Sequence, residues 1–294
     1  MQLTNLNSKR LILVDLDGTV LNNDGKTMNP LTKKALMQAQ ADGHIVAIIT
    51  GRPFRAIKDI YHELGLTSLL TNFDGAHISD PSRREFKRIV FSINSDIIQQ
   101  IINEPVIKAS VENIIFEYYD KVLIWKEDAD LDQFFHLSDL KSPNSTEQLI
   151  TGSPWELWDG PSTNIVLKLK KSSYKNRVFR TLAKYHDAVK IQSDILYGIS
   201  NPSEKPVFTL TNKNASKGFA VNIIAQYYNK NIQNVIAFGD QMNDFEMIQK
   251  VGYGVAMKNA ADALKFVADG VTHKTNDEGG VGDYLNHILK GDDY

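Results

Sequence analysis

The chain has 294 residues, of which 42% are hydrophobic and 23% charged, a balance typical of a globular protein with a sizeable core. Its formal net charge of -2 argues against a general attraction to nucleic acid or anionic membranes, and the absence of cysteine excludes disulfides, zinc–thiolate sites and thiol catalysis. The sequence shows neither an apolar signal core nor a membrane-spanning run, so we expect a cytoplasmic protein of about two domains.

The first 65 residues alternate between predicted strands and helices. Residues 11–14 and 45–49 are continuous apolar runs, which are typical of strands buried on both faces of a parallel sheet. Asn29 followed by Pro30 predicts a helix start, Gly43 suits the end of that helix, and a second helix is expected over 54–64. This order favours an α/β fold with a Rossmann-like, doubly wound parallel sheet.

The middle of the chain differs from the two ends. Segments of alternating character predict strands with one solvent-exposed face at 114–118, 121–125 and 163–169, beside helices at 94–103 and 173–186. The C-terminal third returns to the first style, with helices expected at 219–228, 244–250 and 260–268 and strands at 235–238 and 254–257. We therefore expect a core formed by residues 1–84 and 206–294, with an inserted α+β domain at 85–205.

Polar residues follow or precede these apolar segments in four places. They are Asp15-Leu16-Asp17-Gly18-Thr19, Thr50-Gly51-Arg52, Ser216-Lys217-Gly218 and residues 239–244. Ligands of open α/β sheets bind at the carboxyl ends of the strands, so we expect these segments to meet. Together they offer carboxylates for a hard cation, a lysine and N–H groups for an anion, and a nucleophile, which are the needs of phosphoryl transfer. Taken alone, the first segment also fits an ordinary acidic turn.

These ordered motifs resemble the haloacid dehalogenase (HAD) superfamily, specifically its Cof-type phosphatases with a type IIB (C2) cap. The family patterns DxDGT(L/V), (T/S)GRP, sKG, GDxxND and VAMxNA are met at residues 15–20, 50–53, 216–218, 239–244 and 255–260, and 275–281 resembles the closing segment. The motifs span residues 11 to 285 in the family's order. One departure is that many relatives read NGA where this chain has Asp74-Gly75-Ala76.

The resemblance implies a Mg²⁺-dependent phosphatase in which Asp15 attacks phosphorus and becomes an aspartyl-phosphate, and Asp17 is the general acid and base. It implies that Asp15, Asp240 and the main-chain carbonyl of Asp17 bind the metal. The phosphate ligands that it implies are Leu16, Thr50, Gly51, Lys217 and Asn243. Asp244 and Arg52 are expected to support the site, Arg52 either by a structural ion pair or by a substrate contact.

A cap of this size covers the cleft, so the resemblance implies small phosphorylated metabolites, such as sugar phosphates or phosphorylated cofactors, as substrates. Two alternatives stay open. A phosphotransferase such as a phosphohexomutase needs extra basic residues, and Lys168, Lys170 and Lys171 are weak support for it. A non-catalytic phosphate-binding regulatory protein should lack Asp15 or Asp17.

We expect a monomer or homodimer with no nucleic-acid or membrane partner. Trp155 and Trp158 are expected to pack within the cap rather than line the cleft.

Overall fold

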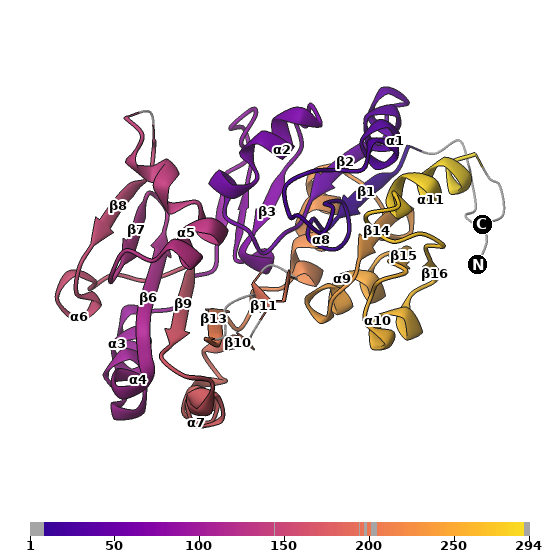
Figure 1. Cartoon of the computed structure of the whole chain (residues 1–294). Coiled ribbons are helices and arrows are strands. Elements are labelled where there is room, and N and C mark those ends of the chain that lie inside the picture. Colours follow the sequence, from indigo (N-terminus) through magenta and orange to yellow (C-terminus); the bar gives the residue numbers. More distant parts are fainter. Residues whose placement is uncertain (1–8, 144, 194, 197–198, 201–204, 291–294) are drawn as a thin grey trace.

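The computed structural model of the chain describes residues 9–143, 145–193, 195–196, 199–200 and 205–290. Two large sheets organise it. In Figure 1 a five-stranded sheet lies to the right, and strands β6 to β9 of a six-stranded sheet lie to the left. Among the described residues, no helix combines the length and hydrophobicity needed to cross a bilayer.

The five-stranded sheet is parallel throughout and has the strand order β16-β15-β14-β1-β2. Its strands are β1 (Leu11–Val14), β2 (Ile45–Ile48), β14 (Val235–Gly239), β15 (Tyr253–Ala256) and β16 (Gly270–Val271). Because β1 has a strand on each side and helices on both faces, all four of its residues are buried, which explains its unbroken apolar run. The α/β fold with a parallel-sheet core is confirmed.

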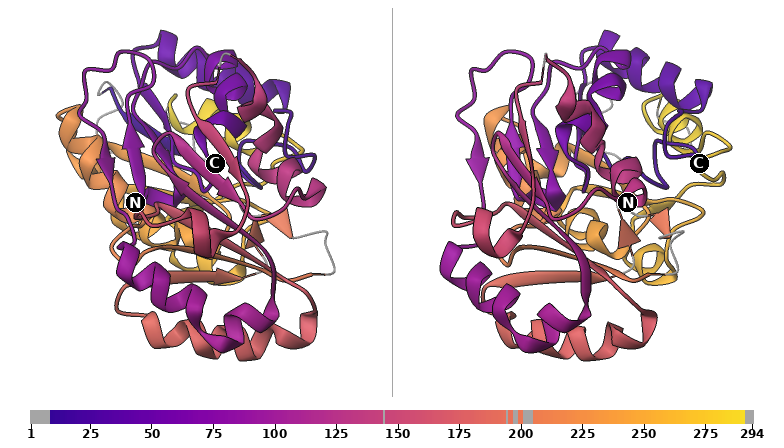
Figure 2. Two further views of the ribbon diagram at one scale, coloured as in Figure 1. Left: turned by 90° about the vertical axis from the view of Figure 1, so that its left-hand side faces the viewer. Right: turned by 60° about the vertical axis from the view of Figure 1, so that its left-hand side comes forward.

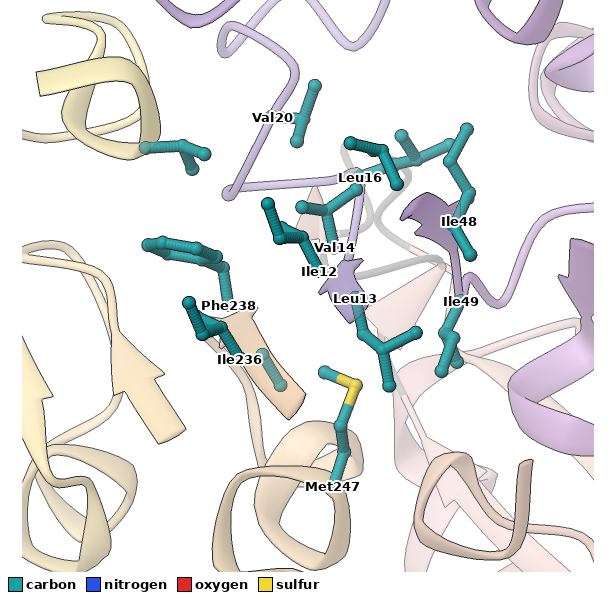
Figure 3. Packing of buried hydrophobic residues seen from close by; sticks show 14 of the residues in the cluster. Ile12, Leu13, Val14, Leu16, Val20, Ile48, Ile49, Ile236, Phe238 and Met247 are labelled. Carbon is teal, nitrogen blue, oxygen red and sulfur yellow. The ribbon is translucent and has the colours of Figure 1, made fainter. Parts of the chain in front are cut away.

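Helices cover both faces of this sheet. They are α1 (Pro30–Ala41), α2 (Lys58–Glu63), α8 (Lys217–Tyr227), α9 (Phe245–Lys250), α10 (Asp262–Val267) and α11 (Gly280–Ile288). Figure 3 shows Leu13 of β1 pointing toward Met247 of α9, whereas Ile12 and Phe238 occupy the other side of the strands. There the Phe238 ring meets Tyr284 of α11 edge to face, with the ring centres 5.9 Å apart.

Capping side chains mark the start of two helices of the core. Asn29 caps α1 by accepting a hydrogen bond from the N–H of Leu31, as predicted. The helix expected over 54–64 is instead a 3₁₀ turn, η1 (Phe54–Ala56), followed by α2, because Ile57 between them has the non-helical φ of -130°. The helix expected to begin at residue 219 begins two residues earlier, because Ser216 accepts from the N–H of Phe219 as its N-cap.

The six-stranded sheet has the order β10-β13-β9-β6-β7-β8 and is antiparallel except for the pair β7 and β8. Its strands are β6 (Val111–Tyr118), β7 (Lys121–Ile124), β8 (Gln148–Thr151), β9 (Asn164–Leu169), β10 (Val189–Ser193) and β13 (Val207–Asn212). Around it lie α3 (Ser95–Asn103), α4 (Pro105–Ser110), α5 (Ala129–Phe135), α6 (Pro154–Leu157) and α7 (Lys175–Leu182). Figure 2 shows α3, α4 and α7 below this sheet, against one of its faces.

The prediction that one face of this sheet is exposed is wrong for its centre. All six residues of β9 are buried. The second face is covered by α5 and the 3₁₀ turn η3 (Leu137–Lys141), which bring Phe135 and Leu137 against Ile115 and Val166. The two tryptophans pack within this unit, as expected. Trp158 stacks on Phe116 with the ring centres 5.3 Å apart, and the Trp155 indole packs against Trp125 edge to face.

Two small sheets complete the fold. They are formed by β3 (Leu70–Asn72), β4 (His77–Ser79) and β5 (Ile89–Val90), and by β11 (Ile195–Leu196) and β12 (Ile199–Ser200). The division into a core and an insert stays a prediction, and residues 1–8 and 291–294 of its core lie outside the described residues. Strand pairing does not follow the predicted bounds of the insert, residues 85 and 205. β5 lies after residue 84 but pairs with β4, and β13 lies after residue 205 but joins the six-stranded sheet.

Candidate active site

The structure brings together the four polar segments that the sequence analysis selected. Val14 at the end of β1 is in register with Phe238 of β14 and with Ile48 of β2, so the loops that follow these three parallel strands emerge at one edge of the sheet. Lys217, the first residue of α8, reaches the same edge and contacts Asp15 in the loop after β1. Residues more than 200 positions apart in the sequence therefore share one buried site.

Lys217 lies at the centre of this site. Its Nζ donates to Oδ1 of Asp15 and to Oδ1 of Asp244, each at 2.7 Å, and its side chain is fully buried. Burial alone would lower the pKa of Lys217, but the charges of Asp15 and Asp244 outweigh it and raise that pKa well above its usual value. The lysine is therefore a fixed cation inside the protein.

Asp15, Asp240 and Asp244 form a compact carboxylate group. One oxygen from each lies within 4.8 Å of the others, and all three residues are buried. Burial raises the pKa of Asp15 although Lys217 opposes the shift, and burial together with the charge of Asp244 raises the pKa of Asp240 to about 8. Because these buried carboxylates repel one another, a cation bound among them would stabilise their ionised forms.

Gly18 allows Asp240 to approach the loop after β1. Its φ of +73° is in the left-handed region, and a Cβ on Gly18 would fall 2.2 Å from Oδ2 of Asp240. Two neighbours hold this arrangement. The Thr19 hydroxyl donates to Oδ1 of Asp240 at 3.2 Å, and Asn259 Nδ2 donates to the Gly18 carbonyl at 2.7 Å.

Asp244 orients its neighbours and uses both of its oxygens to do so. Oδ1 accepts from Lys217, and Oδ2 accepts from the N–H groups of Asp240 at 3.0 Å and Gln241 at 3.1 Å. The second pair of bonds fixes the backbone turn of η7 (Met242–Asp244), which carries Asn243. Both carboxylate oxygens of Asp244 therefore already accept hydrogen bonds, one from Lys217 and the other from the loop after β14.

Arg52 forms a buried ion pair with Asp17, one of the two roles left open for it. Its Nε donates to Oδ2 of Asp17 at 2.8 Å, Nη2 contacts Oδ1, and Nη2 also donates to the Gly25 carbonyl at 2.9 Å. The N–H of Arg52 donates to the Thr50 hydroxyl at 3.1 Å. Burial raises the pKa of Asp17, while the hydrogen bonds and charge of Arg52 oppose that shift.

These motifs and this fold identify the family. Residues 12–285 match the model of the haloacid dehalogenase-like hydrolases. The chain belongs to this family. The 5-amino-6-(5-phospho-D-ribitylamino)uracil phosphatase YitU of Bacillus subtilis is 30% identical over 279 residues, which cover 95% of this chain and 97% of that protein. The pyridoxal phosphate phosphatase YbhA of Escherichia coli is 25% identical over 268 residues, covering 87% and 90%.

The fold agrees with that of solved HAD structures. The HAD subclass IIB sugar phosphatase BT4131 superposes with a TM-score of 0.71 at 18% identity, covering 95% of this chain and 98% of that one. The resemblance to Cof-type, type IIB HAD phosphatases is therefore confirmed, and the chain is a HAD-type phosphatase.

The carboxylates of this HAD phosphatase fit a divalent cation. Asp15, Asp240 and Asp244 offer only oxygen donors, which hard cations prefer. Because Asp244 already holds Lys217 and the η7 turn, Asp15 and Asp240 are the better candidates to contact the ion. Leu16 buries its side chain in the core, which leaves only its main chain for a ligand.

Sequence reasoning missed several residues of the site. Thr19 and Asn259 lie within the DxDGT and VAMxNA motifs, and their hydrogen bonds support Asp240 and Gly18. Gln192 of β10 reaches Asp74 from the six-stranded sheet at 2.9 Å. No local signal marks it, because a single glutamine on an amphipathic strand is ordinary.

Two lysines of the basic run at residues 168–171 pair with groups of the protein itself. Lys168 is buried and its Nζ pairs with Asp128 at 2.8 Å and Asp130 at 2.9 Å. Lys170 donates to the main-chain carbonyl of Ala109 at 3.0 Å. Two of the three lysines that favoured a phosphohexomutase are thus engaged in contacts within the protein, whereas Lys171 is exposed.

Proposed function

We propose that this HAD phosphatase is a Mg²⁺-dependent hydrolase of small phosphorylated metabolites that acts through an aspartyl-phosphate on Asp15. One observation carries the proposal: a buried, charged Lys217 hydrogen-bonds Asp15 beside the carboxylate of Asp240, at the carboxyl edge of a parallel sheet. Lys217 holds one Asp15 oxygen, which leaves the other to face an incoming phosphorus.

Two steps follow from this assignment. In the first, an Asp15 oxygen bonds to phosphorus, the ester P–O bond breaks, and Asp17 gives its proton to the departing oxygen. In the second, water attacks phosphorus while Asp17 takes its proton, and the bond to Asp15 breaks to release inorganic phosphate. Burial supports the protonated form of Asp17 that the first step requires, and the Arg52 pair supports the ionised form that the second requires.

Asp15, Asp240 and the main-chain carbonyl of Asp17 would hold the Mg²⁺. When bound, the cation offsets the repulsion between the Asp15 carboxylate and a phosphate dianion. An all-oxygen donor set favours Mg²⁺ over zinc or copper.

Phosphate oxygens would be bound by the Lys217 ammonium, the Asn243 amide, the Thr50 hydroxyl and the main chain at Leu16 and Gly51. Thr50 and Gly51 lie just after β2, separated from it only by Ile49, so their groups emerge at the same sheet edge as Asp15. Lys217 is already charged, which suits it to the growing negative charge of the transition state.

The proposed substrates are small phosphate monoesters, either sugar phosphates or phosphorylated cofactors. Support comes from the relatives, whose names give a phosphoribitylamino-uracil and pyridoxal phosphate as their substrates. The test is phosphate release from a panel of sugar phosphates, pyridoxal phosphate, flavin mononucleotide and phosphoribityl compounds, each with Mg²⁺ and with EDTA. We expect Mg²⁺-dependent release from at least one class. Release from none of them, or equal release in EDTA, would contradict the proposal.

A further inference from the structure

Asp74 lies in a backbone turn whose position is fixed on two sides. The turn joins β3 to β4, and Asp74 has φ 52° and ψ 35°, a left-handed conformation that Asn and Asp tolerate best. Its N–H donates to the Thr50 carbonyl at 3.0 Å. On the other side, Gly75 (φ +103°) lies so close to the start of α8 that a Cβ would fall 2.3 Å from the Ser216 carbonyl oxygen.

The Asp74 carboxylate joins the two sheets at the active site. Its Oδ1 accepts from Asn243 Nδ2 at 3.0 Å, and its Oδ2 accepts from Gln192 Nε2 at 2.9 Å. Lys217 Nζ lies 3.7 Å from Oδ1. Asn243 belongs to the loop after β14, whereas Gln192 belongs to β10 of the six-stranded sheet. One buried side chain thus touches two of the proposed phosphate ligands and a residue of the second sheet.

The acid is chemically suited to this position in a way that an amide is not. A carboxylate has two acceptor oxygens and can accept from two NH₂ groups at once. The asparagine that many relatives carry here has one acceptor and one donor, so one of the two NH₂ groups would face another NH₂ group. The link between Asn243 and Gln192 through residue 74 therefore depends on a feature in which this chain departs from the family pattern.

We propose that Asp74 is a positioning residue that holds Asn243 and Gln192 so that the second N–H of each amide faces the substrate. Gln192 then becomes a substrate contact that the six-stranded sheet contributes to phosphate binding. The inference rests on the proposed function, because it takes Asn243 and Lys217 as phosphate ligands. It also predicts the opposite of what charge alone predicts. By charge alone, removing the negative charge 3.7 Å from Lys217 should strengthen phosphate binding.

The decisive experiment exchanges the acid and the amide. Asp74→Asn, Gln192→Glu and the double variant are compared with wild type for the Kd of inorganic phosphate with Mg²⁺, by calorimetry, and for KM and kcat. We expect each single variant to weaken phosphate binding and raise KM by about tenfold, because each mismatches one hydrogen bond at the site. The double variant again pairs one acid with one amide and so restores the position of Asn243, but the carboxylate introduced by Gln192→Glu has no N–H for the phosphate. It should therefore bind phosphate better than the product of the two single effects and still more weakly than wild type.

Lys190→Gln is the matched control. Lys190 is also on β10 and contacts Glu246 of α9 at 3.6 Å, so this variant loosens a second link between the sheets without touching Asp74. We expect its phosphate Kd and its KM to equal those of wild type.

Three outcomes would overturn the inference. Tighter phosphate binding by Asp74→Asn would make Asp74 a repelling charge, and a double variant no better than the product of the single effects would exclude a direct link. A wild-type enzyme that binds no phosphate would also overturn it. A wild-type enzyme that binds phosphate but hydrolyses no ester would instead refute the proposed function, and the phosphate Kd values of the variants would still decide the role of Asp74.

Discussion

Arg52 forms a bidentate ion pair with the Asp17 carboxylate, with Nε on one oxygen and Nη2 on the other, and both side chains are buried. The two influences on Asp17 oppose each other. Burial favours the neutral acid and is the larger, so the pKa of Asp17 is raised, while Arg52 holds the rise back. In the proposed mechanism, Arg52 would therefore adjust how readily Asp17 carries the proton that the leaving oxygen needs.

Arg52→Gln should shift the pH profile of kcat to higher pH. Without the guanidinium, the pKa of Asp17 rises further, so its protonated form persists to higher pH in the first step and its basic form is reached later in the second. The measurement is kcat against pH for an alkyl phosphate. Arg55→Gln is the control, because it removes a neighbouring arginine whose ion pairs are with Glu117 and Glu147. A shift to lower pH in Arg52→Gln would contradict this role.

Asp15→Asn should abolish turnover while the fold is kept. An amide has nearly the shape of a carboxylate but cannot attack phosphorus, and covalent catalysis is lost with it. Steady-state rates with the best substrate of the panel test the first point, and circular dichroism with thermal unfolding tests the second. Retention of more than about a hundredth of the wild-type rate would rule out Asp15 as the nucleophile.

Asp17→Asn should impair the enzyme in a different way. Asp15 can still attack an aryl phosphate, whose leaving group needs little protonation, but no base remains to activate water. The aspartyl-phosphate should therefore accumulate. Rapid mixing should show a burst of aryl alcohol approaching one equivalent, followed by slow turnover, and a far larger loss with alkyl phosphates. If there is no burst and both substrates lose equally, Asp17 is not the general acid and base.

Gly18→Ala should damage metal binding specifically. The new Cβ would fall 2.2 Å from Oδ2 of Asp240, so that carboxylate must move. Gly65→Ala is a matched control, because Gly65 also has a positive φ (+62°) but nothing within 4 Å of its Cβ site. Both variants should lose about 1–2 kcal/mol of stability from backbone strain. Only Gly18→Ala should raise the Mg²⁺ concentration for half-maximal activity, by about tenfold or more. Equal Mg²⁺ requirements in the two variants would contradict the placement of the metal at Asp240.

Mg²⁺ affinity should fall as the pH drops below about 8. The pKa of Asp240 is raised to about 8, so at lower pH this carboxyl carries a proton that the cation must displace, at a cost of up to about tenfold in affinity per pH unit. Calorimetric titration with Mg²⁺ at pH 6 to 9, in buffers of different ionisation heat, should show proton release at pH 7 and little at pH 9. EDTA should remove activity, and Ca²⁺ should restore it poorly because it is larger. An affinity that is flat from pH 6 to 9 would exclude Asp240 as a ligand.

The sequence predicts those parts of the molecule whose cause is local. The apolar run 11–14 indicates a central strand because burial on both faces leaves no polar position, and Asn29-Pro30 marks a helix start because capping involves only neighbouring residues. Parallel order then predicts that the loops after β1, β2 and β14 meet. The site follows from these steps and from the family motifs.

What the sequence does not predict depends on long-range packing. The strand 164–169 carries polar residues but is buried throughout, because Lys168 pairs with Asp128 and Asp130 at the start of α5. The contact between Gln192 of β10 and Asp74 in the turn between β3 and β4 joins residues 118 positions apart. Neither the strand order of the second sheet nor this side-chain pairing leaves a periodic pattern to detect.

The central place of β1 has a consequence for synthesis. β1 pairs with β2 on one side and with β14 on the other, so one of its edges has no partner until Gly239 is made. At about 5–20 residues per second that wait lasts roughly 10–45 s, during which an apolar strand edge is open to other chains. Ribosome-bound chains that stop before β14 should be cleaved by protease within residues 9–84, and those that include α9 should resist. The strand order therefore predicts that the nascent chain most needs protection from association while residues 49 to 239 are being translated.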